Sequence, residues 1–170
     1  RAASLKDEDF VSKLFVANTH DTLLCFSSYG KVYWIKVYRL PRGGRNAKGR
    51  PIVNLLPLEK DERIQAVLPV KEFNDDQFIF MATETGSVKK TKLSAYSRPM
   101  KTGIKAIKLR DGDRVVNAEI TDGSKEIMLF SNSGKSIRFK ESDARPMGRV
   151  SQGVRGMRLE KNQKIISLVV

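Results

Sequence analysis

Residues 79–86 read Ile-Phe-Met-Ala-Thr-Glu-Thr-Gly, an apolar run followed by polar turn residues and a glycine. This pattern decides the fold because it occurs three times: the other copies are residues 23–30 and 127–134. Each glycine is followed by a β-rich run such as Val88-Lys89-Lys90-Thr91. Two such runs joined by a polar turn that ends in glycine are typical of a β-hairpin. The sequence therefore predicts three hairpin repeats.

Two further patterns recur with the hairpins. Apolar residues stand four and six positions after Gly49, Gly103 and Gly153, and this alternation predicts a strand; the pairs are Val53/Leu55, Ile107/Leu109 and Met157/Leu159. An acidic turn followed by an apolar strand comes next, in residues 61–70, in the segment that begins at 111 and, by similarity, in 7–16 and 164–170.

The repeat period, near 50 residues, indicates about four short strands per unit. Such units are typical of propeller-like blades, which bury their faces against their neighbours. We expect an all-β fold with approximate repeats 7–60, 61–110 and 111–170, and no helix longer than a turn or two. The chain starts at Arg1 with neither an initiator methionine nor a secretory signal, so we expect a cytoplasmic fragment of a longer protein.

Charge follows the same repeat. The chain has 32 Lys and Arg against 19 Asp and Glu, a net charge of +13. Windows 31–58, 87–110 and 135–159 hold 22 of these basic residues but only 2 acidic ones, so they sum to +20 and the remainder to −7. A surface charged only for solubility would mix the signs. No stretch approaches the roughly 18 apolar residues of a membrane span, so nucleic acid is the expected polyanion.

The strand after each hairpin glycine carries basic residues on one face. The fourth and sixth positions after the glycine read Trp34/Lys36, Lys90/Lys92 and Arg138/Lys140. Lys and Arg with few aromatic or amide neighbours suit the phosphates of duplex DNA, without sequence readout. The predicted DNA-binding residues are Lys36, Arg42, Arg45, Lys48, Arg50, Lys89, Lys90, Lys92, Arg98, Lys101, Lys105, Lys135, Arg138, Lys140, Arg145, Arg149 and Arg155.

Residues for catalysis are missing from the sequence. His20 is the only histidine and Cys25 the only cysteine, which excludes an ordinary zinc site and leaves no histidine-based triad. Residues 133–136, Ser-Gly-Lys-Ser, match the end of a phosphate-binding loop, but Leu129 stands where its first glycine is required. We expect a chain that is not an enzyme and that binds no metal or cofactor.

Residues 15–21, Phe-Val-Ala-Asn-Thr-His-Asp, and 49–58, Gly-Arg-Pro-Ile-Val-Asn-Leu-Leu-Pro-Leu, closely resemble the C-terminal domain of bacterial DNA gyrase A. Residues 80–83 and 137–142 extend the resemblance, which covers essentially the whole chain. It implies a partial β-pinwheel, with about three four-stranded blades of a six-bladed domain. In that fold neighbouring blades exchange strands, and DNA wraps around a basic rim.

The resemblance also implies a role within a larger enzyme. Wrapping of duplex DNA would enable ATP-dependent negative supercoiling by the holoenzyme. The catalytic tyrosine and the ATPase site would lie outside this chain, and ATP and Mg²⁺ would act elsewhere. The implied partners are duplex DNA, the N-terminal cleavage core of gyrase A itself and gyrase B in a heterotetramer, at the nucleoid in the cytoplasm. The family's basic, glycine-rich box has no full copy here, so we expect weaker wrapping than by the complete domain.

Two alternatives remain open from the sequence. The C-terminal domain of the corresponding topoisomerase IV polypeptide shares the architecture, although the match over residues 50–58 favours gyrase. The other alternative is a propeller-like protein-interaction module whose basic rim binds an acidic partner.

Overall fold

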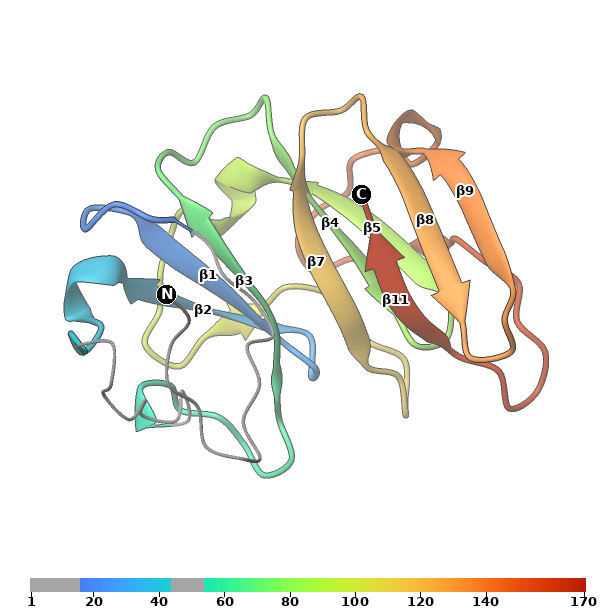
Figure 1. Cartoon of the computed structure of the whole chain (residues 1–170), viewed down its shortest axis with the longest axis horizontal. Coiled ribbons are helices and arrows are strands. Elements are labelled where there is room, and N and C mark those ends of the chain that lie inside the picture. Colours follow the sequence, from blue (N-terminus) through green and yellow to red (C-terminus); the bar gives the residue numbers. More distant parts are fainter. Residues whose placement is uncertain (1–15, 44–53) are drawn as a thin grey trace.

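In the computed structural model, which describes residues 16–43 and 54–170, the chain folds into three small antiparallel sheets (Figure 1). The expected all-β class is confirmed, since the described residues contain strands and three short 3-10 turns but no α-helix. The strands are β1 (Thr22–Ser27), β2 (Lys31–Lys36), β3 (Ile64–Val70), β4 (Phe78–Thr83), β5 (Ser87–Lys92), β6 (Ile104–Lys105), β7 (Val115–Thr121), β8 (Glu126–Ser131), β9 (Ser136–Lys140), β10 (Val154–Arg155) and β11 (Ile165–Val169), and the turns are η1 (Val37–Arg39), η3 (Leu93–Tyr96) and η4 (Glu141–Asp143).

The three predicted hairpins are present as β1–β2, β4–β5 and β8–β9. Each turn closes in the same way, because the glycine amide donates to the carbonyl three residues earlier at 3.1, 3.1 and 3.2 Å for Gly30, Gly86 and Gly134. All three glycines have positive φ, between 77° and 93°. Only glycine adopts this conformation without a steric penalty, which explains why it ends each turn.

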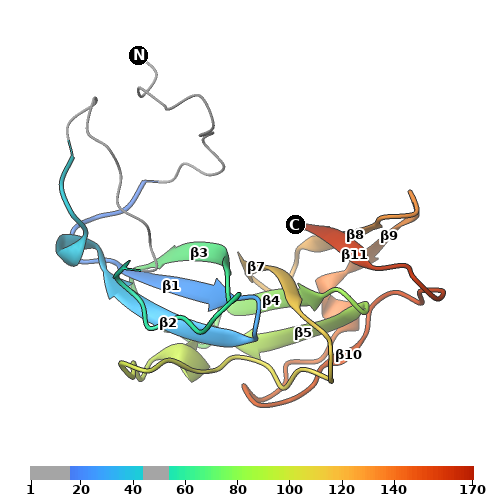
Figure 2. The ribbon, with the colours of Figure 1, turned by 90° about the horizontal axis from the view of Figure 1, so that it is seen from below.

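Each sheet is a blade that combines one hairpin with strands from further along the chain. The strand orders are β3-β1-β2-β6, β10-β5-β4-β7 and β11-β8-β9. The acidic-turn strands β3, β7 and β11 form the inner side of the blades, and β6 and β10 are added outside the hairpin of the preceding repeat (Figure 2). The first two sheets thus draw strands from two of the predicted repeats each, and the third lies within one. The repeat boundaries themselves stay a prediction.

The structure corrects one predicted strand. Ile107/Leu109 and Met157/Leu159 are not in strands; the strands are the two residues that follow Gly103 and Gly153, namely β6 and β10. The backbone turns in after them because the amides of Ile107 and Met157 bond to a hairpin carbonyl and both side chains become buried. The third member of this set, Val53, lies outside the described residues, as does almost all of the predicted segment 7–16.

The third blade has three strands rather than four. No described segment occupies the place beside β9 that β6 and β10 occupy beside β2 and β5. Each outer strand comes from the repeat that follows the hairpin, and no further hairpin follows β8–β9 in the described residues. Consequently β9 is mostly exposed along its length.

The core lies between adjacent blades rather than within them. Strand β4 of the middle blade is buried on both faces: Ile79 and Met81 pack toward Leu24 and Phe26 of the first blade. The alternate residues Phe80 and Ala82 pack toward Ile127 and Leu129 of the third. Period-two alternation thus gives β4 two apolar faces, each for one neighbour.

A first prediction concerns the hairpin glycines. A Cβ added at Gly86 would lie 2.5 Å from the carbonyl oxygen of Met157, whereas nothing lies within 4 Å of one added at Gly134. Gly134→Ala should therefore cost only the positive-φ penalty, about 1–2 kcal/mol, in the free energy of unfolding. Gly86→Ala should cost more, because the backbone at Met157, just after the outer strand β10, must also shift. Chemical denaturation of both variants measures this, and equal losses would contradict the assigned role of Gly86.

Candidate nucleic-acid interface

The same basic position recurs at one corner of each blade. Lys36, Lys92 and Lys140 are the last residues of β2, β5 and β9, and all three are exposed. Each has an extended backbone and precedes a 3-10 turn. We call them the corner lysines.

The chain geometry fixes these corners. The first residue of each 3-10 turn donates its amide to a carbonyl at or just before the start of the hairpin's first strand, at 3.1, 2.9 and 2.8 Å in the three blades; the pairs are Val37–Asp21, Leu93–Gln77 and Glu141–Lys125. Because the hydrogen bond is the same in each blade, the corner lysines occupy equivalent places. A periodic array of cations results.

The loops that follow the corners add further cations and lie side by side. The amide of Lys108 donates to the carbonyl of Ser151 at 3.1 Å, and the Arg149 guanidinium donates to the carbonyl of Lys105. Loops from two consecutive repeats are thereby tied together. The other predicted contacts that are exposed in the described chain are Arg42, Arg98, Lys101, Lys105, Lys135, Arg138, Arg145 and Arg155, while Arg149 is half-buried.

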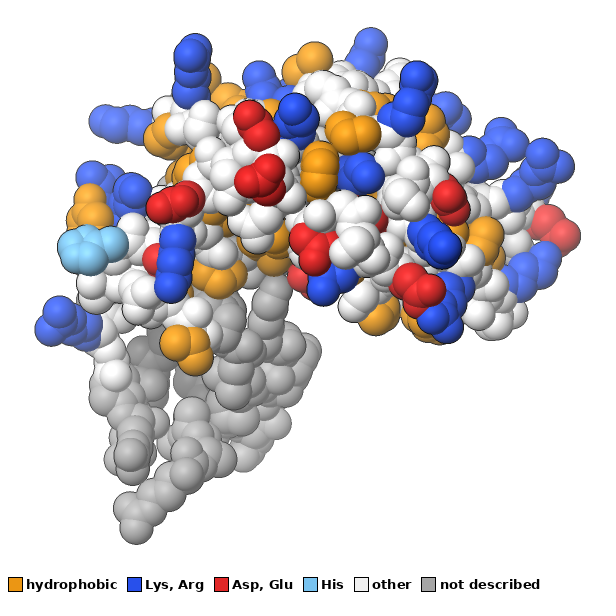
Figure 3. All heavy atoms as spheres, turned by 90° about the horizontal axis from the view of Figure 1, so that it is seen from above, with side chains coloured by type: hydrophobic (Ala, Val, Ile, Leu, Met, Phe, Trp, Pro, Cys, Tyr) orange, Lys and Arg blue, Asp and Glu red, His pale blue; other side chains and the backbone are white. Residues whose placement is uncertain are grey.

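Figure 3 shows the resulting separation of charge. Lys and Arg side chains project from its upper outline, and the Asp and Glu side chains of this face lie below that outline. The upper outline of Figure 3 lies on the side where Figure 2 shows β2, β5 and β10. The outer side of the blades thus presents cations along its outline, while other Lys and Arg side chains lie among the acidic ones lower on this face.

Two predicted contacts are corrected, because Lys89 and Lys90 are buried, with exposed fractions of 0% and 4%. The Lys89 ammonium donates to the carbonyls of Ala106 and Arg149, so it holds the two tied loops instead of facing solvent. The Lys90 ammonium donates to the Glu141 carbonyl at 3.2 Å, is 3.9 Å from its carboxylate and lies 5.0 Å from the centre of the Phe78 ring. The prediction that Lys90 shares an exposed strand face with Lys92 is wrong because the following repeat covers β5 at Lys90.

Other predicted residues differ in their freedom to bind an anion. Arg138 pairs with Glu126, and Lys135 lies 3.6 Å from Glu160, but both pairs are exposed. Exposed pairs contribute at most about 1 kcal/mol, so a phosphate can replace the carboxylate. Arg45, Lys48 and Arg50 lie outside the described residues. The prediction omitted four exposed cations that the same basic windows contain: Arg39, Lys108, Arg110 and Arg158.

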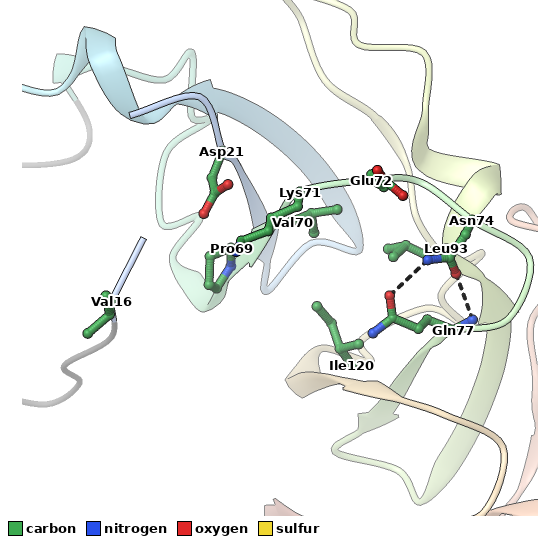
Figure 4. A pocket seen from close by; sticks show the side chains of 10 residues that line it. All are labelled: Val16, Asp21, Pro69, Val70, Lys71, Glu72, Asn74, Gln77, Leu93 and Ile120. Atoms are coloured by element: carbon green, nitrogen blue, oxygen red, sulfur yellow. Dashed lines mark hydrogen bonds between the residues drawn. The ribbon is translucent and has the colours of Figure 1, made fainter. Parts of the chain in front are cut away.

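A hollow between the first two blades does not suit an anion. It has a volume of about 410 Å³ and is lined by Asp21, Lys71 and Glu72 among others, with Asn74 and Gln77 joined by hydrogen bonds on one wall (Figure 4). Two carboxylates against one lysine repel phosphate. This hollow is therefore not part of the candidate interface.

In residues 16–43 and 54–170 the structure offers no clear basis for metal binding, a reactive thiol or a membrane-spanning helix. No cluster of three or more His, Cys, Asp or Glu lies there in a position to hold a metal ion. Burial raises the pKa of the Cys25 thiol to about 12, so it is protonated and a poor nucleophile at neutral pH. None of the helices among these residues is long and apolar enough to cross a membrane.

Stacked blades, two of them completed to four strands by the following repeat, define a propeller-type β domain. The chain belongs to the family described as DNA gyrase C-terminal domain, beta-propeller, which matches residues 21–71, 77–122 and 125–170. The resemblance found in the sequence is thereby confirmed.

Individual relatives agree with this assignment. The chain is 56% identical over 169 residues to the A subunit of DNA gyrase from Salmonella typhimurium, covering 99% of this chain and 19% of that protein. The C-terminal domain of DNA topoisomerase IV superposes with a TM-score of 0.88 and 31% identity, covering 97% of this chain and 51% of that one. A DNA gyrase A C-terminal domain superposes with a TM-score of 0.72 and 27% sequence identity, covering 98% of this chain and 54% of that one. The chain thus spans about a fifth of its curated gyrase relative.

A second prediction follows from the buried ammonium of Lys89. Burial, and to a smaller degree the nearby Arg149 guanidinium, lowers the pKa of Lys89 to about 7 from an ordinary 10.5. Between these values the unfolded chain holds a proton that the folded chain has lost, so the Lys89 contribution to the free energy of unfolding rises with pH through this window and is lowest below it.

The measurement is urea denaturation of the wild type and of Lys89→Met at several pH values from about 6 to about 9. The difference in unfolding free energy should grow in favour of the wild type above the lowered pKa, with a slope of at most about 1.4 kcal/mol per pH unit. A difference that is constant with pH would contradict the shifted pKa, whatever its size.

Proposed function

We propose that this chain binds the backbone of duplex DNA along the outer side of its blades and bends the duplex around them. The observation that carries the proposal is the corner lysine, which recurs at the same exposed place in all three blades (Lys36, Lys92 and Lys140). DNA presents phosphates at regular intervals, so a periodic row of cations is complementary to it. Contacts of this kind position the duplex but carry no base information.

Bending is the expected consequence of an arc of blades. A strong bend in a short site costs on the order of 1–6 kcal/mol, which repeated phosphate contacts must offset. The side-by-side loops around Lys108 and Ser151 supply such contacts between one corner and the next. Binding should show little sequence preference, because contacts between Lys or Arg and the phosphates carry no base information.

The family suggests the wider role. As the C-terminal domain of DNA gyrase A, the chain would wrap DNA so that the holoenzyme introduces negative supercoils at the expense of ATP. The N-terminal cleavage core of gyrase A and the gyrase B protein would be its partners, in the cytoplasm at the nucleoid. This chain would need no cofactor of its own, since ATP and Mg²⁺ would act elsewhere in the assembly.

A third prediction tests the corner lysines through salt. The logarithm of the DNA association constant should fall linearly with the logarithm of salt concentration, with a slope of about −0.9 per phosphate contact. The double variant Lys92→Ala/Lys140→Ala should bind more weakly, and its slope should be shallower by about 2. Fluorescence anisotropy with a short labelled duplex at several salt concentrations gives both values.

Lys161→Ala is the matched control, because Lys161 is exposed but lies in a turn outside the basic windows. It should leave affinity and slope close to those of the wild type. If the double variant behaves like this control, the corner lysines do not bind phosphate. If an acidic protein binds while duplex DNA does not, the chain is an interaction module instead.

A fourth prediction separates wrapping from binding. Nicked circular DNA ligated in the presence of the chain should yield a shifted distribution of topoisomers, and the shift should grow with protein concentration and report the sign of the wrap. The Lys92→Ala/Lys140→Ala variant should reduce the shift at equal DNA occupancy. An unshifted distribution at saturation would contradict wrapping and leave simple binding intact.

A further inference from the structure

A hollow of about 660 Å³ lies at the outer junction of the first and second blades. Trp34, Phe73 and Met100 are among its apolar lining residues, and Tyr38 and Pro99 contribute further apolar surface. The volume is in the range of small-ligand sites, which are mostly apolar with a few polar groups. The duplex track described above makes no use of this apolar surface.

The charge around this hollow is uniform. Lys36, Arg39, Lys71 and Lys101 line it, and no Asp or Glu among residues 16–43 and 54–170 does. None of these four side chains forms an ion pair with any residue in the described parts of the chain. The hollow of Figure 4 differs in this respect, since two carboxylates line it. An anion is therefore the complementary ligand.

Aromatic rings are accessible within the hollow. The indole N–H of Trp34 donates to the carbonyl of Tyr96 at 2.8 Å, which fixes the plane of a half-buried ring. Tyr38 is 59% exposed, and the Arg39 guanidinium carbon lies 5.8 Å from the centre of its ring. A fixed indole and an exposed phenol beside cations form the kind of surface on which unpaired bases stack.

The equivalent junction between the second and third blades lacks this surface. Lys90 stands at the position of Trp34, four residues after the hairpin glycine, and it pairs with Glu141. A smaller hollow of about 170 Å³ between the second and third blades is lined by other positions, among them Val88, Phe139 and Asp143, and not by Lys90. The site at the first junction is thus not a general consequence of the repeat.

We propose that this hollow binds an unpaired base of single-stranded nucleic acid, with the neighbouring phosphates on the surrounding Lys and Arg side chains. Two of these cations, Lys36 and Lys101, belong to the proposed duplex track, so a strand bound on the rim passes the mouth of the hollow. This inference goes beyond the proposed function, because the bases of an intact duplex are stacked inside the helix and cannot enter.

Trp34 provides the readout, since it is the only tryptophan in the chain. Its fluorescence should be quenched in a saturable manner by an oligothymidylate of about ten nucleotides. A blunt duplex of the same length should bind without comparable quenching. A peptide that combines glutamate with phenylalanine serves as the third probe, because an acidic partner with an apolar anchor has related chemistry.

The variants are Tyr38→Ala and Lys71→Glu, which change exposed residues outside the proposed duplex track. Each should weaken oligothymidylate binding about tenfold, while duplex affinity changes no more than in the charge control described next. Lys161→Glu is the matched charge control and should weaken both ligands equally little. Circular dichroism verifies that the variants fold.

The outcomes separate the two proposals. Loss of duplex binding in the corner-lysine variants bears only on the track, whereas quenching by oligothymidylate bears on the hollow. The inference is overturned if oligothymidylate fails to quench Trp34, if the duplex quenches equally well, or if both variants bind it like the wild type. Quenching by the peptide alone would assign the hollow to a protein partner instead.

Discussion

The carbonyl of the hairpin glycine is the interaction on which the rest of the structure depends. The Gly30 carbonyl accepts the amides of Ala106 and Ile107 at 2.7 and 3.3 Å, and the Gly86 carbonyl accepts those of Gly156 and Met157 at 2.8 and 3.2 Å. Two residues before each glycine, the carbonyls of Ser28 and Glu84 accept the amides that start β7 and β11, at 3.0 and 2.8 Å. One short turn therefore holds the segment that follows the outer strand of its own blade and the start of the inner strand of the next blade. The relative placement of the blades, and with it the line of the rim, follows from this turn.

The same arrangement determines where charge can be exposed. A segment that leaves the corner of one blade must return to the outer edge of the preceding blade, so its loop runs over the outer side and its basic residues face solvent there. Lys89 lies beneath two of these loops and is buried by them. The loops bring carbonyls of Ala106 and Arg149 over β5, and a buried ammonium satisfies them at the expense of a strongly lowered pKa. One predicted DNA contact is thus a structural cation that supports Arg149, itself a candidate contact.

Features that depend on a local sequence pattern could be predicted from the sequence. Features that arise because a distant segment packs over a strand could not. The hairpins, the inner strands and the corner lysines follow from period-two alternation and from a glycine that needs positive φ, so local spacing suffices for them. The burial of Lys89 and Lys90 depends on residues 104–107 and 141–149, which reach β5 only through strand exchange between blades. For the same reason Ile107 was assigned to a strand, although it anchors a loop, and the hollow beside Trp34 was not foreseen, because its walls come from two repeats.

A comparison of the fourth position after the hairpin glycine shows how one scaffold supports different surfaces. In the first two blades the following repeat covers this position: Trp34 bonds to the Tyr96 carbonyl, and Lys90 meets Glu141. In the third blade nothing in the described chain covers it, and Arg138 is exposed beside Glu126. The sixth position, by contrast, is an exposed lysine in every blade. The position that the fold leaves exposed in each blade keeps the charge that a DNA track requires, while the position at the junction varies with its neighbour. An aromatic residue at one junction therefore marks a local site within a periodic rim, which is the physical basis for assigning the two surfaces different ligands.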